Sequence, residues 1–154
     1  NNIVVVFVGS IDYGVKSSKA MHNKIKQVIN EYNLKSHVHF LDYQSNISTL
    51  MSNSDLLVHS TNREAFGLVL VEAMLLGTPI VSTNVEAIPE ILEDTKYTLV
   101  PPNNSSHLRE AVLSYFELPP KRQNEIVNSG KIRAKTFTEK GRRTAEILSI
   151  INKM

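Results

Sequence analysis

Five short runs of β-branched, aromatic and other apolar residues recur along the chain, and this composition predicts strands. The runs occupy residues 3–8, 37–43, 55–60, 79–83 and 97–100. The first run is apolar at every position, which predicts a strand buried on both faces, as in a parallel sheet.

Longer stretches between these runs place apolar residues at helical spacing. We predict helices over residues 17–33, 46–54, 68–76, 87–92, 105–116, 121–135 and 138–152. The apolar face of the first helix consists of Met21, Ile25, Val28, Ile29 and Tyr32. The alternation of strand and helix predicts an α/β fold, a Rossmann-like parallel sheet flanked by helices with right-handed crossovers. No repeat or linker divides the sequence, so we interpret residues 1–154 as one domain.

Composition narrows the chemistry that the chain can support. A net charge of +2 gives no global electrostatic argument for binding nucleic acid. The chain has no cysteine, which excludes disulfides, thiol catalysis and zinc–thiolate sites. His37 and His39 face the same side of a predicted strand without a third ligand, so we predict no metal site. We assign the other three histidines, His22, His59 and His107, to the surface or to loops.

The predicted helix at 68–76 is apolar at every position except Glu72. A helix that is apolar nearly all round is expected to be buried. An ionised carboxylate on such a helix is costly unless it is paired, hydrogen-bonded or placed at a wet edge that a ligand reaches. Glu72 is therefore either a structural carboxylate with a protein partner or a ligand-binding residue.

The residues before this helix favour ligand binding. Glu64 lies in the loop after the third strand, and Phe66-Gly67-Leu68 forms the turn into the helix. A glycine lets the backbone approach a ligand closely, and a helix N-terminus presents N–H groups to oxygen atoms. Ionised carboxylates only accept hydrogen bonds, which suits the hydroxyls of a sugar or ribose. This pattern predicts a site for a sugar nucleotide.

Open α/β sheets bind ligands at the carboxyl ends of their strands, so the loops at 9–17 and 41–45 are also candidates. Gly9, Lys16 and Tyr43 are the residues we single out there. The first loop is close to a phosphate-binding P-loop pattern. Val15, however, separates Gly14 from Lys16, and that motif needs the two residues to be adjacent.

The segment "EAFGLVLVEAMLLGTPIV" resembles the retaining glycosyltransferases of family 4, within the glycosyl transferases group 1. The signature of that family is two glutamates separated by seven residues, which Glu64 and Glu72 match. The resemblance implies the C-terminal, nucleotide-sugar-binding half of a GT-B fold. By the same resemblance, Glu64 would be catalytic and would bond hydroxyls of the transferred sugar. Ala65, Phe66, Gly67 and Leu68 would line the sugar and phosphate site, and Glu72 would accept from the ribose hydroxyls.

The chain also departs from the family pattern. Glu86-Ala87 stands where members usually have Gly-Gly, and an acid there would repel a diphosphate unless it points away. The sequence begins after the point where the family has its first strand of this domain and a diphosphate-clamping Arg and Lys. By the same resemblance, we expect the N-terminal acceptor domain to lie outside this sequence. We therefore expect part of a longer two-domain enzyme, inactive by itself.

The resemblance implies a hexosyltransferase that uses a nucleoside-diphosphate sugar, needs no cofactor and transfers to a glycan, lipid or similar acceptor. We expect a cytoplasmic enzyme of polysaccharide biosynthesis. The C-terminal helices are rich in basic residues, which we interpret as a solvated face, with contact to an anionic membrane surface as the alternative. Two other functions stay open. One is a non-catalytic nucleotide-sugar-binding subunit that needs a partner chain, and the other is a different GT-B enzyme, such as an epimerase.

Overall fold

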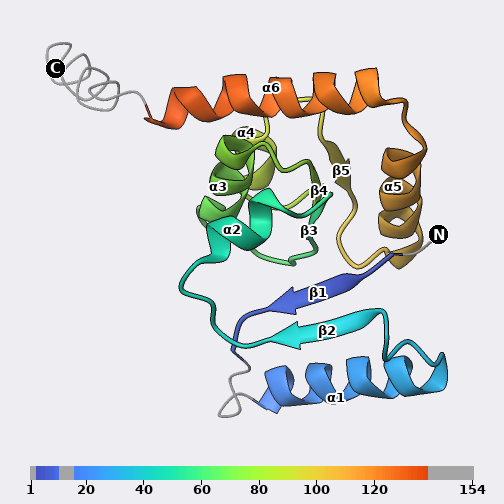
Figure 1. Ribbon diagram of the computed structural model, residues 1–154. Helices are drawn as coiled ribbons and strands as arrows, with labels where there is room; N and C mark the ends of the chain where they lie inside the picture. Colours follow the sequence, from blue (N-terminus) through green and yellow to red (C-terminus); the bar gives the residue numbers. More distant parts are fainter. Residues whose placement is uncertain (1–2, 11–15, 139–154) are drawn as a thin grey trace, which may run out of the picture. The chain divides into compact units, whose positions relative to one another are not determined.

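The computed structural model describes residues 3–10 and 16–138, with side chains described from residue 18 onward after the gap (Figure 1). The elements follow in the order β1 (Val5–Val8), α1 (Lys16–Glu31), β2 (Val38–Leu41), α2 (Ile47–Ser52), β3 (Leu57–His59), α3 (Leu68–Leu76), β4 (Ile80–Thr83), α4 (Ile88–Ile91), β5 (Thr98–Val100), α5 (Ser105–Glu117) and α6 (Pro120–Thr138). The α/β fold class predicted from the sequence is confirmed. The helix predicted at 138–152 lies almost entirely outside the described residues. Contacts divide the chain into two compact units, Asn1–Ile47 and Ser48–Met154, which are described in turn.

The first unit is a strand–helix–strand motif. β1 and β2 pair in parallel, in a register that places Val5 opposite Val38 and Val8 opposite Leu41. The rings of Phe7 and Phe40 stack across the pair with centroids 5.1 Å apart. Parallel strands need a long crossover, and α1 provides it.

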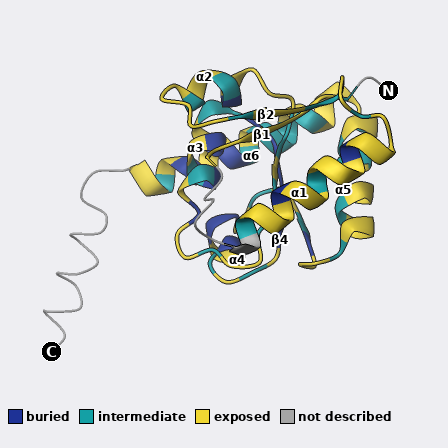
Figure 2. Ribbon diagram, turned by 90° about the horizontal axis from the view of Figure 1, so that it is seen from below, coloured by how far each residue is buried: buried dark blue, intermediate teal, exposed yellow. Residues whose placement is uncertain are grey.

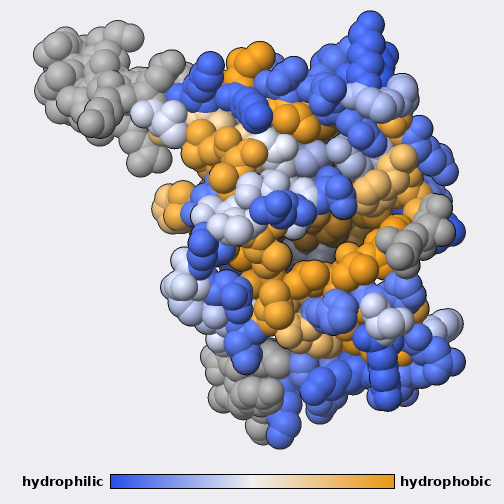
Figure 3. All heavy atoms as spheres, in the orientation of Figure 1, coloured by the Kyte–Doolittle hydropathy of each residue, from blue (hydrophilic) through white to orange (hydrophobic). Residues whose placement is uncertain are grey.

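The strand predicted to be buried on both faces is exposed. The four residues of β1 are between 39% and 42% exposed, and hydrophobic side chains appear at the surface along this strand (Figure 3). The reason is that β2 is the only strand paired with β1 among the described residues. A continuous apolar run is fully buried only where strands and helices surround it on all sides.

The apolar face predicted for α1 is also buried only in part. Ile29 is buried, whereas Met21, Val28 and Tyr32 are exposed. His22, which we expected at the surface, is 9% exposed, and its ring meets the ring of Phe40 edge-on at 4.8 Å. The histidine thus occupies a core position of the helix that the hydrophobic pattern did not mark.

The second unit contains a parallel three-stranded sheet in the order β3-β4-β5. The central strand β4 is buried at every position, and Figure 2 shows buried residues on it and on α3. Its two polar residues bond to the last residue of β3 and to the loop that follows it. Ser82 Oγ donates to the carbonyl of His59 at 3.1 Å, and Thr83 Oγ1 donates to the carbonyl of Thr61 at 2.6 Å. These bonds fix the carboxyl end of β3, where the candidate site begins.

The core of the second unit lies between the sheet and three helices. Leu70, Ala73 and Met74 of α3 have no exposed area, and Ile88 of α4 and Ala134 of α6 are also fully buried. The bounds predicted for α3 are those observed, because glycines in the left-handed conformation, Gly67 and Gly77, flank the helix at both ends.

Arg133 of α6 contacts the last turn of α4 and is not part of a solvated basic face. Its Nε donates to the carbonyl of Ile91 at 3.1 Å, and one Nη donates to the carbonyl of Glu90 at 2.6 Å. Its side chain is only 17% exposed. The interpretation of a solvated face is therefore wrong for this residue.

Lys131 and Lys135 are exposed as expected. Lys140, Arg142 and Arg143 lie outside the described residues, and membrane contact remains a prediction. Within residues 3–10 and 16–138, no helix is long and apolar enough to cross a membrane.

Candidate functional site

The loop at residues 60–67 joins β3 to α3 at the carboxyl end of the sheet, the edge where open α/β sheets bind ligands. Gly67 has φ of 56° and ψ of 37°, and α3 begins at the next residue. A Cβ at this glycine would lie 2.7 Å from Cδ1 of Ile91 and 3.3 Å from Cδ1 of Leu70. Its left-handed conformation favours glycine at the residue before α3, and a Cβ there would also displace the side chain of Ile91.

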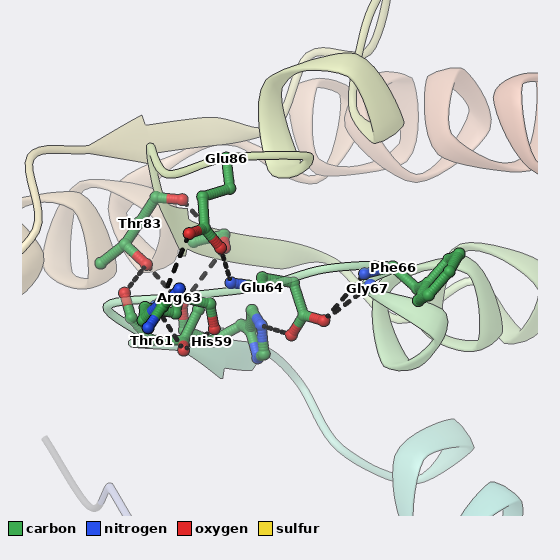
Figure 4. A network of polar contacts seen from close by, with 9 residues as sticks. His59, Thr61, Arg63, Glu64, Phe66, Gly67, Thr83 and Glu86 are labelled. Carbon is green, nitrogen blue, oxygen red and sulfur yellow. Dashed lines mark hydrogen bonds and ion pairs between the residues drawn. The ribbon is translucent and has the colours of Figure 1, made fainter.

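The carboxylate of Glu64 is bound on both of its oxygen atoms (Figure 4). Oε1 accepts from the N–H of Gly67 at 2.8 Å and from the N–H of Phe66 at 3.3 Å. Oε2 lies 3.1 Å from Nε2 of His59. The N–H of Gly67 is the main cause that lowers the pKa of Glu64, and Phe66 and His59 add to it against the opposing effect of burial. Glu64 is thus an ionised, oriented carboxylate at the N-terminus of α3.

His59 belongs to this site and is not the surface or loop residue that the sequence predicts. It is the last residue of β3, and its side chain is 18% exposed. The alternation of side chains between the two faces of a strand could have indicated that His59 is partly buried. Residues 57 and 59 share a face, so His59 points to the same side as Leu57, and both are partly buried.

Glu86 does not point away from the site. Its Oε2 accepts from the backbone N–H of Glu64 at 2.6 Å, and its Oε1 lies 3.5 Å from Nε of Arg63. Its backbone is in the left-handed region, with φ of 43°. The family that the sequence resembles usually has glycine at this position. The loop after β4 therefore holds the loop after β3 through a carboxylate (Figure 4).

Glu72 is exposed, which corrects the expectation of a buried helix. It shares one face of α3 with Leu68 and Leu75, which are 69% and 47% exposed. Only the opposite face of the helix packs into the core, although both faces are apolar in sequence. Of the two alternatives, the structure places Glu72 at a wet edge. It has no hydrogen bond or ion pair with any described residue.

The first turn of α3 also offers backbone donors. Of the described residues, none accepts a hydrogen bond from the N–H of Leu68 or Val69. The N–H groups of Phe66 and Gly67, which the resemblance placed along the sugar and phosphate site, already bond to Glu64. Ala65 and Phe66 are exposed beside this turn.

The remaining candidates lie in the first unit. Gly9 follows β1 with φ of 128°, and its N–H donates to the carbonyl of Leu41 at 2.9 Å. Tyr43 follows β2 and is 77% exposed. Lys16 is the first residue of α1, but its side chain lies outside the described part of the chain. All three therefore remain predictions. The described residues contain no group of three or more His, Cys, Asp or Glu side chains that could hold a metal ion.

Comparison with known proteins gives the family to which this fold belongs. The profile of glycosyl transferases group 1 matches residues 1–133. The chain belongs to this family.

Individual proteins that are similar to this chain match different shares of its length. The N-acetyl-alpha-D-glucosaminyl L-malate synthase of Bacillus anthracis is 40% identical over 75 residues, which are 47% of this chain and 20% of that enzyme. Anabaena HepE, solved in complex with UDP, superimposes with a TM-score of 0.82 at 23% identity, over 99% of this chain and 41% of that one. The C-terminal domain of the group 1 protein LpcC from Francisella tularensis gives a TM-score of 0.73 at 17% identity, over 89% of this chain and 86% of that domain. The fold is therefore that of the C-terminal domain of GT-B glycosyltransferases. The chain spans less than half the length of the first two relatives.

Proposed function

We propose that this chain is the donor-binding domain of a retaining glycosyltransferase of family 4, which transfers a hexose from a nucleoside-diphosphate sugar. The observation behind the proposal is the arrangement of Glu64 and Glu72 about the N-terminus of α3. Glu64 is ionised and held by three hydrogen bonds, whereas Glu72 is exposed and without a partner among the described residues. One carboxylate is fixed in place and the other is accessible to a ligand.

The ribose, the diphosphate and the sugar of the donor each have a counterpart in this arrangement. Glu72 would accept from the ribose hydroxyls, since an ionised carboxylate is a pure acceptor. The N–H groups of Leu68 and Val69, at the positive end of the helix dipole, would face the diphosphate. Glu64 would accept from a hydroxyl of the transferred sugar. Support comes from Anabaena HepE, which was solved with UDP and also with UDP-glucose.

The chemistry of this domain would be electrostatic. As the bond to the sugar breaks, negative charge develops on the departing diphosphate, and fixed N–H dipoles stabilise that charge without reorganising. The acceptor, a glycan or lipid in this proposal, would be supplied outside the donor site. The first two relatives are more than twice as long as the part that this chain matches, which is consistent with a separate acceptor domain.

Calorimetry on the 154-residue chain tests the proposal. The titrants are UDP, UDP-glucose and GDP-mannose. We expect Glu72→Gln to weaken nucleoside diphosphate binding by about tenfold or more, because a hydrogen bond to a charged group contributes ~1.5–3 kcal/mol. Glu117→Gln, on the exposed face of α5, is the matched control and should bind like the wild type. Unchanged affinity in Glu72→Gln, or a wild-type chain that binds none of the three titrants, would overturn the proposal.

A further inference from the structure

We propose that His59 is a positioning residue for sugar recognition, because it orients the Glu64 carboxylate so that one lone pair is left for the transferred sugar. This inference rests on the proposed function and adds to it a residue outside the pair of glutamates.

An ionised carboxylate offers about four lone-pair sites, two on each oxygen. The N–H groups of Phe66 and Gly67 use the two sites on Oε1 of Glu64. His59 uses one of the two sites on Oε2, at 3.1 Å. One site therefore remains, on Oε2. The bond from His59 decides where that site points, since it fixes the rotation of the carboxylate plane.

The proton on His59 follows from the state of its partner. Hydrogen bonds from Gly67 and Phe66 lower the pKa of Glu64, so the carboxylate is ionised at neutral pH and can only accept. Nε2 of His59 must therefore carry a hydrogen, whether the ring is neutral or protonated. The imidazole is a donor to Glu64 in both states, and the orientation of the carboxylate is kept.

The imidazole is presented from a rigid part of the fold. The carbonyl of His59 accepts from Ser82 Oγ at 3.1 Å, and Ser82 lies on the buried central strand β4. The side chains of His59 and Glu64 are 18% and 23% exposed, so solvent screens their contact less than it screens a surface pair. Sites built on strands hold a functional group more accurately than sites built on loops alone. Figure 4 shows the ring reaching from the strand to Oε2.

The quantity that separates positioning from a general structural role is the gain in affinity that the sugar provides. It is the ratio of the dissociation constant for UDP to that for UDP-glucose, or the same ratio for GDP and GDP-mannose, whichever donor the wild type binds. His59→Leu removes the donor with little change in bulk, and His59→Gln retains an N–H near the position of Nε2. His107→Leu, at an exposed position of α5, is the matched control.

We expect His59→Leu to lose about tenfold in affinity for the nucleotide sugar, equivalent to ~1.4 kcal/mol, with the affinity for the free diphosphate unchanged. His59→Gln should recover most of the loss. In a Glu64→Ala background, His59→Leu should cause no further loss, because the group that it orients is gone. Melting temperatures measured on the same samples identify any variant that fails to fold.

The outcomes that overturn the inference differ from those that overturn the proposed function. The positioning role alone is overturned if His59→Leu keeps the full gain in affinity that the sugar provides. It is also overturned if this variant loses affinity equally for the free diphosphate and the nucleotide sugar. Additive losses in the double variant do the same. A wild-type chain that binds neither diphosphate nor nucleotide sugar overturns the proposed function and this inference together.

Discussion

The hydroxyl of Tyr97 occupies the space that a side chain at residue 130 would need. A Cβ added to Gly130 would collide with this hydroxyl and would lie 2.5 Å from Cζ of the same ring. Tyr97 precedes β5, and Gly130 is a buried residue of α6. The glycine therefore allows the helix to pack against the tyrosine, at a helix position where glycine is otherwise unfavourable.

We predict that Gly130→Ala destabilises the chain, although alanine is the better helix former. The gain in helix propensity is about 1 kcal/mol, whereas overpacking at a buried contact typically costs ~1–3 kcal/mol. The difference is a net loss of up to about 2 kcal/mol in the free energy of urea unfolding. An equal or higher stability for Gly130→Ala would show that Tyr97 moves aside at no cost.

Tyr97→Phe serves as the matched variant for this contact. The Tyr97 hydroxyl is buried and, among the described residues, has no hydrogen-bond partner, and burial raises the pKa of Tyr97 to about 12. Removing such a hydroxyl should be neutral or stabilising. In a Tyr97→Phe background, Gly130→Ala should cost less than it does alone, because the colliding atom is absent.

Arg133 is predicted to contribute more to stability than the other basic residues of α6. Arg133→Met removes two hydrogen bonds to the carbonyls that end α4 and should lower the unfolding free energy by about 2 kcal/mol. Arg133→Lys should give an intermediate loss, because an ammonium cannot bridge two carbonyls as a guanidinium does. Lys135→Met, exposed on the same helix, should change the unfolding free energy by less than about 0.5 kcal/mol. Similar losses for the two methionine variants would contradict this role of Arg133.

Much of the fold could be predicted from the sequence because its signals are local. The strands and helices are bounded by glycine, proline and polar turns, and α3 begins and ends where its flanking glycines indicate. The burial of β1 could not be predicted, because an apolar run does not say how many neighbours surround it. The exposure of the helix face that carries Glu72 could not be predicted for a related reason. α3 is apolar on all sides, so its sequence does not mark which side faces the core.

The polar contacts of the candidate site could not be predicted from the sequence. Glu64, Gly67 and Glu72 follow from a contiguous motif. The contact of His59 with Glu64 depends on the strand presenting the ring to the loop, and the contact of Glu86 joins residues that are 22 positions apart. Such contacts arise from the packing of β3 against β4, which no local pattern encodes.

The last prediction concerns the charge of Glu86, beside the N-terminus of α3. Within the proposed function, this carboxylate stands near the diphosphate and repels it, while it also accepts the N–H of Glu64 at 2.6 Å. Glu86→Gln removes the charge and keeps an oxygen acceptor. We expect it to bind UDP about threefold more tightly at low salt, a modest gain because the Glu86 side chain is 47% exposed and solvent screens its charge.

Salt dependence and a second variant separate the effect of the Glu86 charge on UDP binding from the structural role of its side chain. The gain in Glu86→Gln should vanish at 1 M salt, where the screening length falls to about 3 Å. Glu86→Gly relieves the left-handed conformation at φ of 43° but loses the acceptor for Glu64, so its stability should stay within about 1 kcal/mol of the wild type. Calorimetry at both salt concentrations provides the measurement. Weaker UDP binding in Glu86→Gln would mean that the negative charge is needed to hold the Glu64 loop, and that Glu86 supports the site more than it repels the diphosphate.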